Sequence, residues 1–353
     1  MGLGTWLDVV DDVMFQRWHT RRLPTLPAEV CGPDVAGKTF IVTGPTSGIG
    51  TTTAETLAKL GAKVILACRT VERGEALVRG WTRDAARSAT PGPAIDCEVM
   101  KLDLDALGSV RAFAEAIVAR GEPVHCLINN AGVFDMSGAY KKTKDGHEQH
   151  YGTNYLAPAL LALLLAPALR RVGAAEGPAG GPARVVFVCS KLHEFCPALT
   201  LDDLNFERRA YGARAAYAQS KLAELLFARE LERRLGVFGD GDDADASRAA
   251  PFRCLAVHPG NIVTGVVRTL PKIVQTAYRI IMGAILLTPA EGARASLYAA
   301  TREEALEGTG AAPYFESDCA HRRPSAAALD DEAAKALWVK TMETLGLDAG
   351  FEP

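Results

Sequence analysis

A tyrosine and a lysine four residues apart form a pair that could transfer a proton. Tyr217 and Lys221 stand near the start of a segment with helical spacing of apolar residues, Ala213–Leu235. Residues four apart lie on the same face of a helix. A phenol has an ordinary pKa of about 10, which an adjacent ammonium and a cofactor cation would lower. The pair therefore predicts acid/base chemistry, although the same spacing is also typical of a surface contact.

A glycine-rich turn near the N-terminal end favours the chemical interpretation. An apolar run at 38–42 leads into Thr-Gly-Pro-Thr-Ser-Gly-Ile-Gly at 43–50, and a helical stretch follows at 51–60. Strand, glycine turn and helix occur in the order that a dinucleotide site requires, because the glycines let backbone N–H groups approach a pyrophosphate. We expect cofactor contacts from the residues of this turn: Gly44, Thr46, Ser47, Gly48, Ile49 and Gly50.

The next strand ends indicate which dinucleotide binds. The apolar run Lys63–Cys68 ends at Arg69, where an acid would bind a ribose 2′-hydroxyl and an arginine suits a 2′-phosphate. Arg69 therefore predicts NADP, with a surface arginine as the alternative. A third strand at 98–102 ends in Asp103 and Leu104, which could contact the adenine, although Asp103 could equally cap the next helix.

Two further strand ends carry residues suited to a ligand. The run 124–128 ends in Asn-Asn-Ala-Gly at 129–132, where small residues let the backbone come close to a ligand. The run 184–189 is followed by Ser190, at the edge where parallel sheets bind ligands. By pattern alone, Asn154 is a helix cap or a buried hydrogen-bonding group.

The composition is that of an ordinary globular protein. The chain has 353 residues, a formal charge of −3 and 48% hydrophobic residues, so it presents no overall basic field for nucleic acid. Its eight cysteines form no CxxC pair, which indicates reduced thiols in an intracellular protein and argues against a disulfide framework or a metal site.

The chain organisation predicts one catalytic domain with additions. An NADP-binding domain occupies residues 35–325, preceded by an extension, 1–34, and followed by a helical tail, 326–353. In the extension, residues 6–15 have the pattern of an amphipathic helix that packs on the body or on a membrane surface. The acidic residues of this extension argue against a transit peptide.

Four internal segments stand out by composition. We expect a Gly/Ala/Pro-rich mobile loop at 173–183 and a disordered acidic insert at 239–250. The most apolar segments, 156–169 with its two prolines and 273–287, are each shorter than the roughly 20 apolar residues that span a membrane. Since no signal peptide precedes them, we expect the protein to be cytoplasmic or peripherally associated with a membrane.

Taken together, these motifs resemble the short-chain dehydrogenase/reductase family. The glycine turn, the segment 129–132, Ser190, the Tyr217/Lys221 pair and the segment 259–264 occur in the order found in that family. The retinol dehydrogenase-like branch is resembled more closely. Four segments of the chain resemble that branch, at 64–69, 202–205, 217–224 and 314–338.

The resemblance implies a fold and a set of roles. The fold would be α/β, a Rossmann-type doubly wound, mostly parallel sheet of about seven strands with helices on both faces. Tyr217 would exchange a proton with the substrate oxygen, Lys221 would lower the tyrosine pKa and hold the nicotinamide ribose, Ser190 would bind the same oxygen, and Asn154 would anchor a relay water. Further cofactor contacts are implied for Asn130, Ala131, Gly132, Pro259, Gly260, Ile262 and Thr264.

The resulting hypothesis is an NADP(H)-dependent oxidoreductase acting on a hydrophobic alcohol or carbonyl, such as a retinoid, steroid or lipid, beneath an apolar cap at 266–287. One alternative is a C=C reductase of the protochlorophyllide reductase type. Another is a non-catalytic NADP-binding regulator that docks through residues 6–15. Two departures from the family pattern are Cys189 before Ser190 and the sequence Ala-Pro-Ala at 157–159. A homodimer and a peripheral membrane contact stay open.

Overall fold

The computed structural model describes residues 16–20, 22–23, 27–90, 92–135, 137–176, 181–235, 252–262, 285–307 and 311–348. The segments 6–15, 239–250 and 266–284, for which the sequence predicts a helix, a disordered insert and most of an apolar cap, lie outside these residues. Thr264 lies outside them as well.

The centre of the protein is a mostly parallel eight-stranded sheet in the order β3-β2-β1-β4-β5-β6-β7-β8, in which only the β7/β8 pair is antiparallel. The predicted Rossmann-type sheet is therefore confirmed. Its strands are β1 Thr39–Thr43, β2 Lys63–Cys68, β3 Asp96–Lys101, β4 Cys126–Asn129, β5 Arg184–Val188, β6 Arg253–Val257, β7 Tyr314–Phe315 and β8 His321–Arg322.

The central strands are apolar along their whole length because both faces of the sheet are covered. In β1 and β5 every residue is buried. Strand order reverses between β1 and β4, and at such a switch point the loops diverge and leave a crevice outside the carboxyl ends of the strands. The predicted site residues follow these carboxyl ends.

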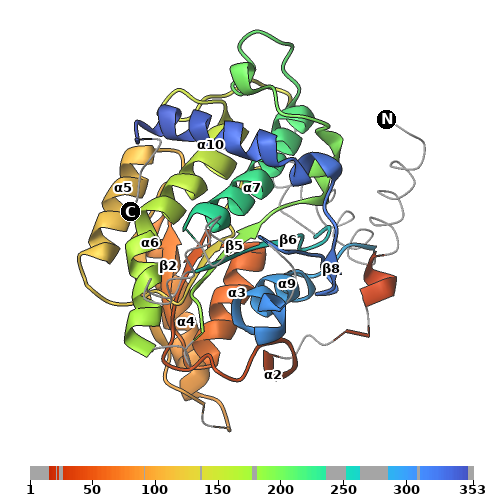
Figure 1. Ribbon diagram of the computed structural model, residues 1–353. Coiled ribbons are helices and arrows are strands. Elements are labelled where there is room, and N and C mark those ends of the chain that lie inside the picture. Colours follow the sequence, from red (N-terminus) through yellow and green to blue (C-terminus); the bar gives the residue numbers. More distant parts are fainter. Residues whose placement is uncertain are drawn as a thin grey trace.

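Helices cover the sheet on both faces (Figure 1). One face packs on α5 Leu107–Val118, α6 Ala157–Glu176, α7 Ala213–Leu235 and α10 Asp331–Leu345. The other packs on α3 Gly48–Lys59, α4 Val71–Ala86 and α9 Pro289–Thr301. Further helical turns among the described residues are α2 Pro27–Val30, η1 Tyr151–Leu156, η3 Lys191–Phe195, η4 Leu201–Asp203, η6 Glu303–Leu306 and η7 Ala326–Leu329.

Helix α10 belongs to the main core. Its side chains Leu337, Trp338 and Met342 are buried, and the Trp338 ring stacks on Phe227 of α7 with centroids 5.5 Å apart. The helical segment at the C-terminal end is thus packed into the same hydrophobic cluster as α6 and α7.

Two expectations about the segment around α6 are wrong. Residues 173–176, predicted as part of a mobile loop, continue α6, which contains Pro167 in its interior. The apolar segment is also longer than predicted, because the π-helical turn η1 leads directly into α6. Within the described residues, 151–172 form one helical segment long and apolar enough to cross a membrane, and 89% of its most apolar window is buried in the protein. Core packing accounts for that apolar character.

Candidate active site

The glycine turn between β1 and α3 has the shape of an anion-binding loop. Gly48 has a φ of +57°, and a Cβ placed there would meet nothing within 4 Å, so the turn is open on that side. Ser47 precedes α3 without forming a side-chain cap, and the first turn of the helix carries no acid. The N–H groups of this helix start are therefore placed to receive a phosphate.

A hydrogen-bonded latch joins this turn to the loop after β4. The Thr43 hydroxyl accepts bonds from the N–H groups of Asn130 and Ala131, at 3.0 and 2.9 Å. The Asn130 amide donates to the Thr43 carbonyl at 2.8 Å. Gly50 fits against it so closely that a Cβ there would lie 2.4 Å from the Asn130 amide nitrogen. The latch aligns two predicted cofactor segments, and the sequence prediction assigned no role to Thr43.

The residues that follow β2 and β3 differ in their exposure to solvent. Arg69 is exposed, and its carbonyl accepts a bond from the Lys101 ammonium. Asp103 is buried and paired with Lys144 at 2.6 Å. Burial would raise the pKa of Asp103, but the hydrogen bond and charge of Lys144 outweigh it and lower that pKa. The neighbouring Leu104 packs into the core.

Tyr217 and Lys221 lie on one face of α7, as predicted. The Lys221 ammonium is 5.8 Å from the centroid of the half-buried Tyr217 ring. Burial raises the pKa of Tyr217, while the charge of Lys221 and a hydrogen bond with Ser190 act to lower it. The lysine therefore acts in the expected direction, but the protein groups alone leave the tyrosine pKa above its ordinary value.

Lys221 is buried and fully hydrogen-bonded. Its ammonium donates to the Val188 carbonyl at the end of β5, at 2.9 Å. It also contacts both carboxylate oxygens of Glu224, at 3.0 and 2.9 Å. Burial would lower the pKa of Lys221, but the negative charge of Glu224 outweighs that effect and raises it. The lysine is therefore held as a cation.

Ser190 lies two residues after β5 and caps the turn η3. Its hydroxyl accepts a bond from the Leu192 N–H at 3.2 Å. Its carbonyl lies 2.8 Å from Nδ1 of His193, whose other nitrogen accepts a bond from the Ser325 N–H at 3.2 Å. The buried imidazole thus connects Ser190 to the segment before η7. Sequence reasoning did not find His193, since a lone histidine in a loop carries no pattern.

Asn154 is a buried hydrogen-bonding group in η1. Its side-chain oxygen accepts a bond from the Val133 N–H at 2.7 Å, and its amide donates to the Val133 carbonyl and the Ser220 hydroxyl, at 3.0 and 3.1 Å. It therefore ties the loop after β4 to α7, beside the predicted acid/base pair. A Cβ at Gly132 would lie 3.3 Å from its oxygen and 3.7 Å from the Lys221 ammonium.

The loop after β6 carries the predicted cofactor residues Pro259, Gly260 and Ile262. Pro259 is buried, Gly260 has a φ of +82°, and Ile262 forms a parallel bridge with Leu287. The Gln16 amide donates to the Asn261 carbonyl at 2.6 Å and accepts from the Asn261 N–H at 2.7 Å. A residue near the N-terminal end thus supports a predicted cofactor loop, across 245 positions of sequence.

Sequence comparisons identify the family. The family description "short chain dehydrogenase" matches residues 38–198. The chain is 36% identical to the dehydrogenase/reductase SDR family member FEY of Arabidopsis thaliana, over 97% of this chain and 86% of that one. It is 35% identical to human retinol dehydrogenase 14, covering 88% and 87%, and 37% identical to mouse polyprenol dehydrogenase, covering 93% and 88%. The chain belongs to the short-chain dehydrogenase family.

A solved structure has a similar fold. An uncharacterized protein from Mycobacterium Paratuberculosis superposes with a TM-score of 0.63 at 32% identity, over 92% of this chain and 98% of that one. The resemblance to retinol dehydrogenases, inferred from the segments 64–69, 202–205, 217–224 and 314–338, is confirmed by the identity with human retinol dehydrogenase 14. This short-chain dehydrogenase has the Rossmann fold expected of it.

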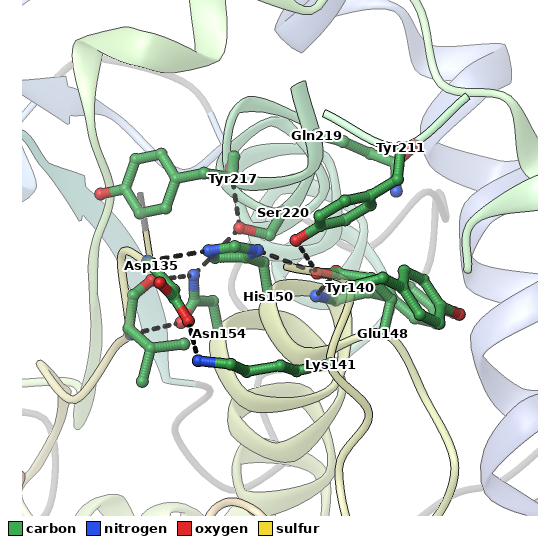
Figure 2. A network of polar contacts seen from close by, with 12 residues as sticks. Asp135, Tyr140, Lys141, Glu148, His150, Asn154, Tyr211, Tyr217, Gln219 and Ser220 are labelled. Atoms are coloured by element: carbon green, nitrogen blue, oxygen red, sulfur yellow. Dashed lines mark hydrogen bonds and ion pairs between the residues drawn. The ribbon is translucent and has the colours of Figure 1, made fainter. Parts of the chain in front are cut away.

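A polar network that the sequence prediction missed lies under Tyr217 (Figure 2). His150 is completely buried, with Nδ1 2.9 Å from a Glu148 oxygen and Nε2 accepting from the Asp135 N–H at 3.2 Å. The Tyr211 hydroxyl donates to Glu148 at 3.2 Å. The His150 ring meets the Tyr217 ring edge-on at 6.0 Å. In this short-chain dehydrogenase the buried His150 ring thus packs against the Tyr217 ring, whose hydroxyl points away from Glu148 (Figure 2).

All eight cysteines are free. Six are buried, and burial raises the pKa of each thiol, for instance that of Cys31 to about 11. Thiols with such high pKa values are weak nucleophiles at neutral pH. The six buried cysteines of this short-chain dehydrogenase are therefore held as neutral thiols.

Proposed function

We propose that the protein interconverts a carbonyl and an alcohol on a hydrophobic substrate, using NADP(H), with Tyr217 as general acid/base. The observation that carries this proposal is the convergence of the phenol, the Lys221 ammonium and the Ser190 hydroxyl at one edge of the sheet. Arranged in this way, a proton donor and a second hydrogen-bond donor can both reach one substrate oxygen.

The residues at this edge fit a dinucleotide. The open glycine turn and the start of α3 would hold the pyrophosphate, and the segments 130–132 and 259–262 would flank the nicotinamide half. Asp103 and Leu104 follow the strand next to Arg69 and would lie near the adenine. NADP(H) supplies or accepts the hydride when bound.

Arg69 supports the preference for NADP over NAD. Its exposed guanidinium lies at the end of β2, where a 2′-phosphate would be recognised. The residue directly after β2 is thus a base, and the next acid along the chain is Glu72 in the first turn of α4. An exposed cation at the strand end, in the place of an acid, suits the additional phosphate.

The chain's own residues would divide the chemistry as follows. Tyr217 gives a proton to the carbonyl oxygen during reduction and removes it from the alcohol during oxidation. Ser190 donates a hydrogen bond to the same oxygen and meets the charge that develops on it. Lys221 stabilises the phenolate, and Asn154 holds the loop after β4 against α7 and anchors the water that returns the proton.

A hydrophobic substrate is favoured by the surroundings of Tyr217. The Phe134 ring packs on the Tyr217 ring with centroids 4.3 Å apart and is 38% exposed. Tyr140, also 38% exposed, contacts Tyr211 edge to face, with ring centroids 5.1 Å apart. Exposed aromatic faces beside polar reacting groups are typical of sites for apolar ligands. Relatives named retinol dehydrogenase and polyprenol dehydrogenase support the same class.

The test is NADPH oxidation with a panel of retinal, long-chain aldehydes, isoprenoid aldehydes and ketones. Tyr217→Phe should lower kcat/KM by about 10²–10⁴-fold, because it removes only the exchangeable proton. Tyr211→Phe, which removes a neighbouring hydroxyl bonded to Glu148, is the matched control and should retain most of the activity. Equal rates for the wild type and Tyr217→Phe would refute the proposed mechanism.

A further inference from the structure

A buried carboxylate lies one turn along α7 from the proposed acid/base pair. Glu224 is 2% exposed, and both its oxygens contact the Lys221 ammonium. The third contact of this ammonium is the Val188 carbonyl at 2.9 Å. An ammonium has three donors, so in this arrangement each donor has a partner within the protein.

The surroundings of Glu224 are otherwise poor in charge. Within the described residues, the titratable groups that act on it are Lys221 of its own helix and Cys189 at the end of β5, which forms a hydrogen bond with it. Tyr217 of the same helix is in turn influenced by Glu224. The Glu224 carboxylate, the Lys221 ammonium and the Tyr217 phenol therefore influence one another electrostatically. The Cys189 thiol, which follows β5, contacts the same carboxylate.

Stability is a weak explanation for this pair. Two charges taken out of water lose about as much hydration as they gain in attraction, so a buried ion pair stabilises a fold little compared with apolar packing. Helix α7 also buries the apolar side chains Leu222, Leu225 and Leu226. An acid buried on this helix, with both oxygens on the lysine, points to control of the lysine charge.

We propose that Glu224 is a positioning residue that fixes the Lys221 ammonium beside Tyr217 and offsets part of the positive charge that the phenol senses. This inference rests on the proposed function of Tyr217 as the acid/base. It adds a third ionisable member to the pair and explains how the lysine is held in place beside the phenol.

Two physical effects follow from the geometry. Because the carboxylate is negative and close, it raises the pKa of Tyr217, against the effect of Lys221. Burial raises the pKa of Glu224 itself to about 7, while the charge of Lys221 acts to lower it. When the carboxylate charge is removed, as in Glu224→Gln, the full charge of Lys221 acts on the phenol. Loss of the carboxylate should therefore make Tyr217 more acidic.

The experiment compares Glu224→Gln with a matched control, Glu230→Gln. Glu230 is equally buried on α7, but its ion-pair partners are Arg233 and Arg234. We expect the Tyr217-dependent limb of the pH profile of kcat/KM to move to lower pH by about one unit in Glu224→Gln. In Glu230→Gln it should stay in place. If the Tyr217-dependent limb stays at the same pH in Glu224→Gln as in the wild type, the inference is wrong.

A second measurement reads the phenol without using activity. Ultraviolet difference titration of each protein against the same protein carrying Tyr217→Phe isolates the ionisation of Tyr217. Its pKa should fall by a similar amount in Glu224→Gln and recover in Glu224→Asp, which keeps the charge. An equal fall in Glu224→Asp would assign the effect to packing and refute the inference.

These variants distinguish a failure of the proposed function from a failure of the role of Glu224. If Glu224→Gln does not fold, Glu224→Met, which is apolar and of similar length, replaces it in both measurements. If Tyr217→Phe keeps full activity, the proposed function fails, whereas the titration still decides whether Glu224 sets the ionisation of Tyr217. If Tyr217→Phe is inactive and the limb does not move in Glu224→Gln, only the role of Glu224 fails.

Discussion

Two of the buried carboxylates of helix α7, Glu224 and Glu232, lie at opposite edges of the sheet. Glu224 contacts Lys221 beside the carboxyl end of β5, and Glu232 accepts bonds from Arg253 and from the Ala312 N–H. Arg253 is the first residue of β6, so this second pair lies at the amino edge. In both acids burial raises the pKa and the charge of the basic partner opposes it.

The two pairs differ in the other groups they contact. Around Arg253, the Leu306 carbonyl takes a further guanidinium bond at 2.8 Å, so the cation joins β6 to the turn η6. Lys221 instead lies beside a phenol and a loop with exposed Gly132. Open parallel sheets bind ligands at their carboxyl edge. The comparison suggests that one buried pair holds elements together and the other serves chemistry.

The largest expected effect is on stability, and it tests whether the Glu232–Arg253 pair holds the fold together without taking part in catalysis. Glu232→Gln removes the buried carboxylate charge that pairs with Arg253, which should lower the free energy of unfolding by about 3–5 kcal/mol. Activity per folded molecule should stay unchanged, because the amino edge lies away from the reacting groups. Urea unfolding followed by circular dichroism, with kcat/KM measured on the folded protein, checks both points.

The control for that measurement is again Glu230→Gln. The arginine partners of Glu230 are 19% and 40% exposed, so water can solvate them after the change, and the loss should stay within about 1 kcal/mol. A loss of activity in Glu232→Gln larger than its loss of folded protein would contradict the division between the two edges.

A smaller effect is expected for Arg69, which tests the carboxyl edge without touching the core. Removing its charge-assisted bond in Arg69→Ala should weaken NADPH binding by about 1.5–3 kcal/mol and leave NADH binding nearly unchanged. Isothermal titration with each nucleotide measures the difference. Arg79→Ala, an exposed arginine on α4, provides the control. Equal weakening for both nucleotides would show that Arg69 does not read the 2′-phosphate.

Much of the site could be predicted because its members follow strands. Apolar runs bounded by glycine or polar residues mark where a parallel strand ends, and parallel strands bring their carboxyl ends to one edge. For this reason the amino-acid sequence alone assigns Ser190, Arg69 and the segment 129–132 to the ligand side of the sheet. The helix Ala213–Leu235 was predictable with its bounds, because its apolar spacing is regular.

The remaining site residues depend on contacts that no local pattern encodes. A glutamate three residues after a lysine is usually a solvated pair, and only packing of α7 against β5 buries Glu224. Gln16 reaches Asn261 across the fold, and His193 acquires its role from Ser325, 132 positions away. The continuation of η1 into α6 could not be inferred either, since prolines at 158 and 167 predict interruptions.

The smallest predicted effect tests how tightly the carboxyl edge is built. In Gly50→Ala the new methyl would lie 2.4 Å from the Asn130 amide nitrogen and 2.5 Å from the Gly44 carbonyl oxygen, so the latch between the two loops must shift. Such overpacking costs about 1–3 kcal/mol, and here it should appear mainly as weaker NADPH binding.

Gly80→Ala on α4 is the matched control, because nothing lies within 4 Å of its Cβ position and alanine favours a helix by about 0.5–1 kcal/mol. It should stabilise the protein slightly and leave binding alone. Titration calorimetry and thermal unfolding on both variants separate the two effects. If Gly50→Ala binds NADPH as well as the wild type, the latch through Asn130 does not shape the phosphate turn, and the close packing at this edge serves the fold, as it does at the edge of Glu232.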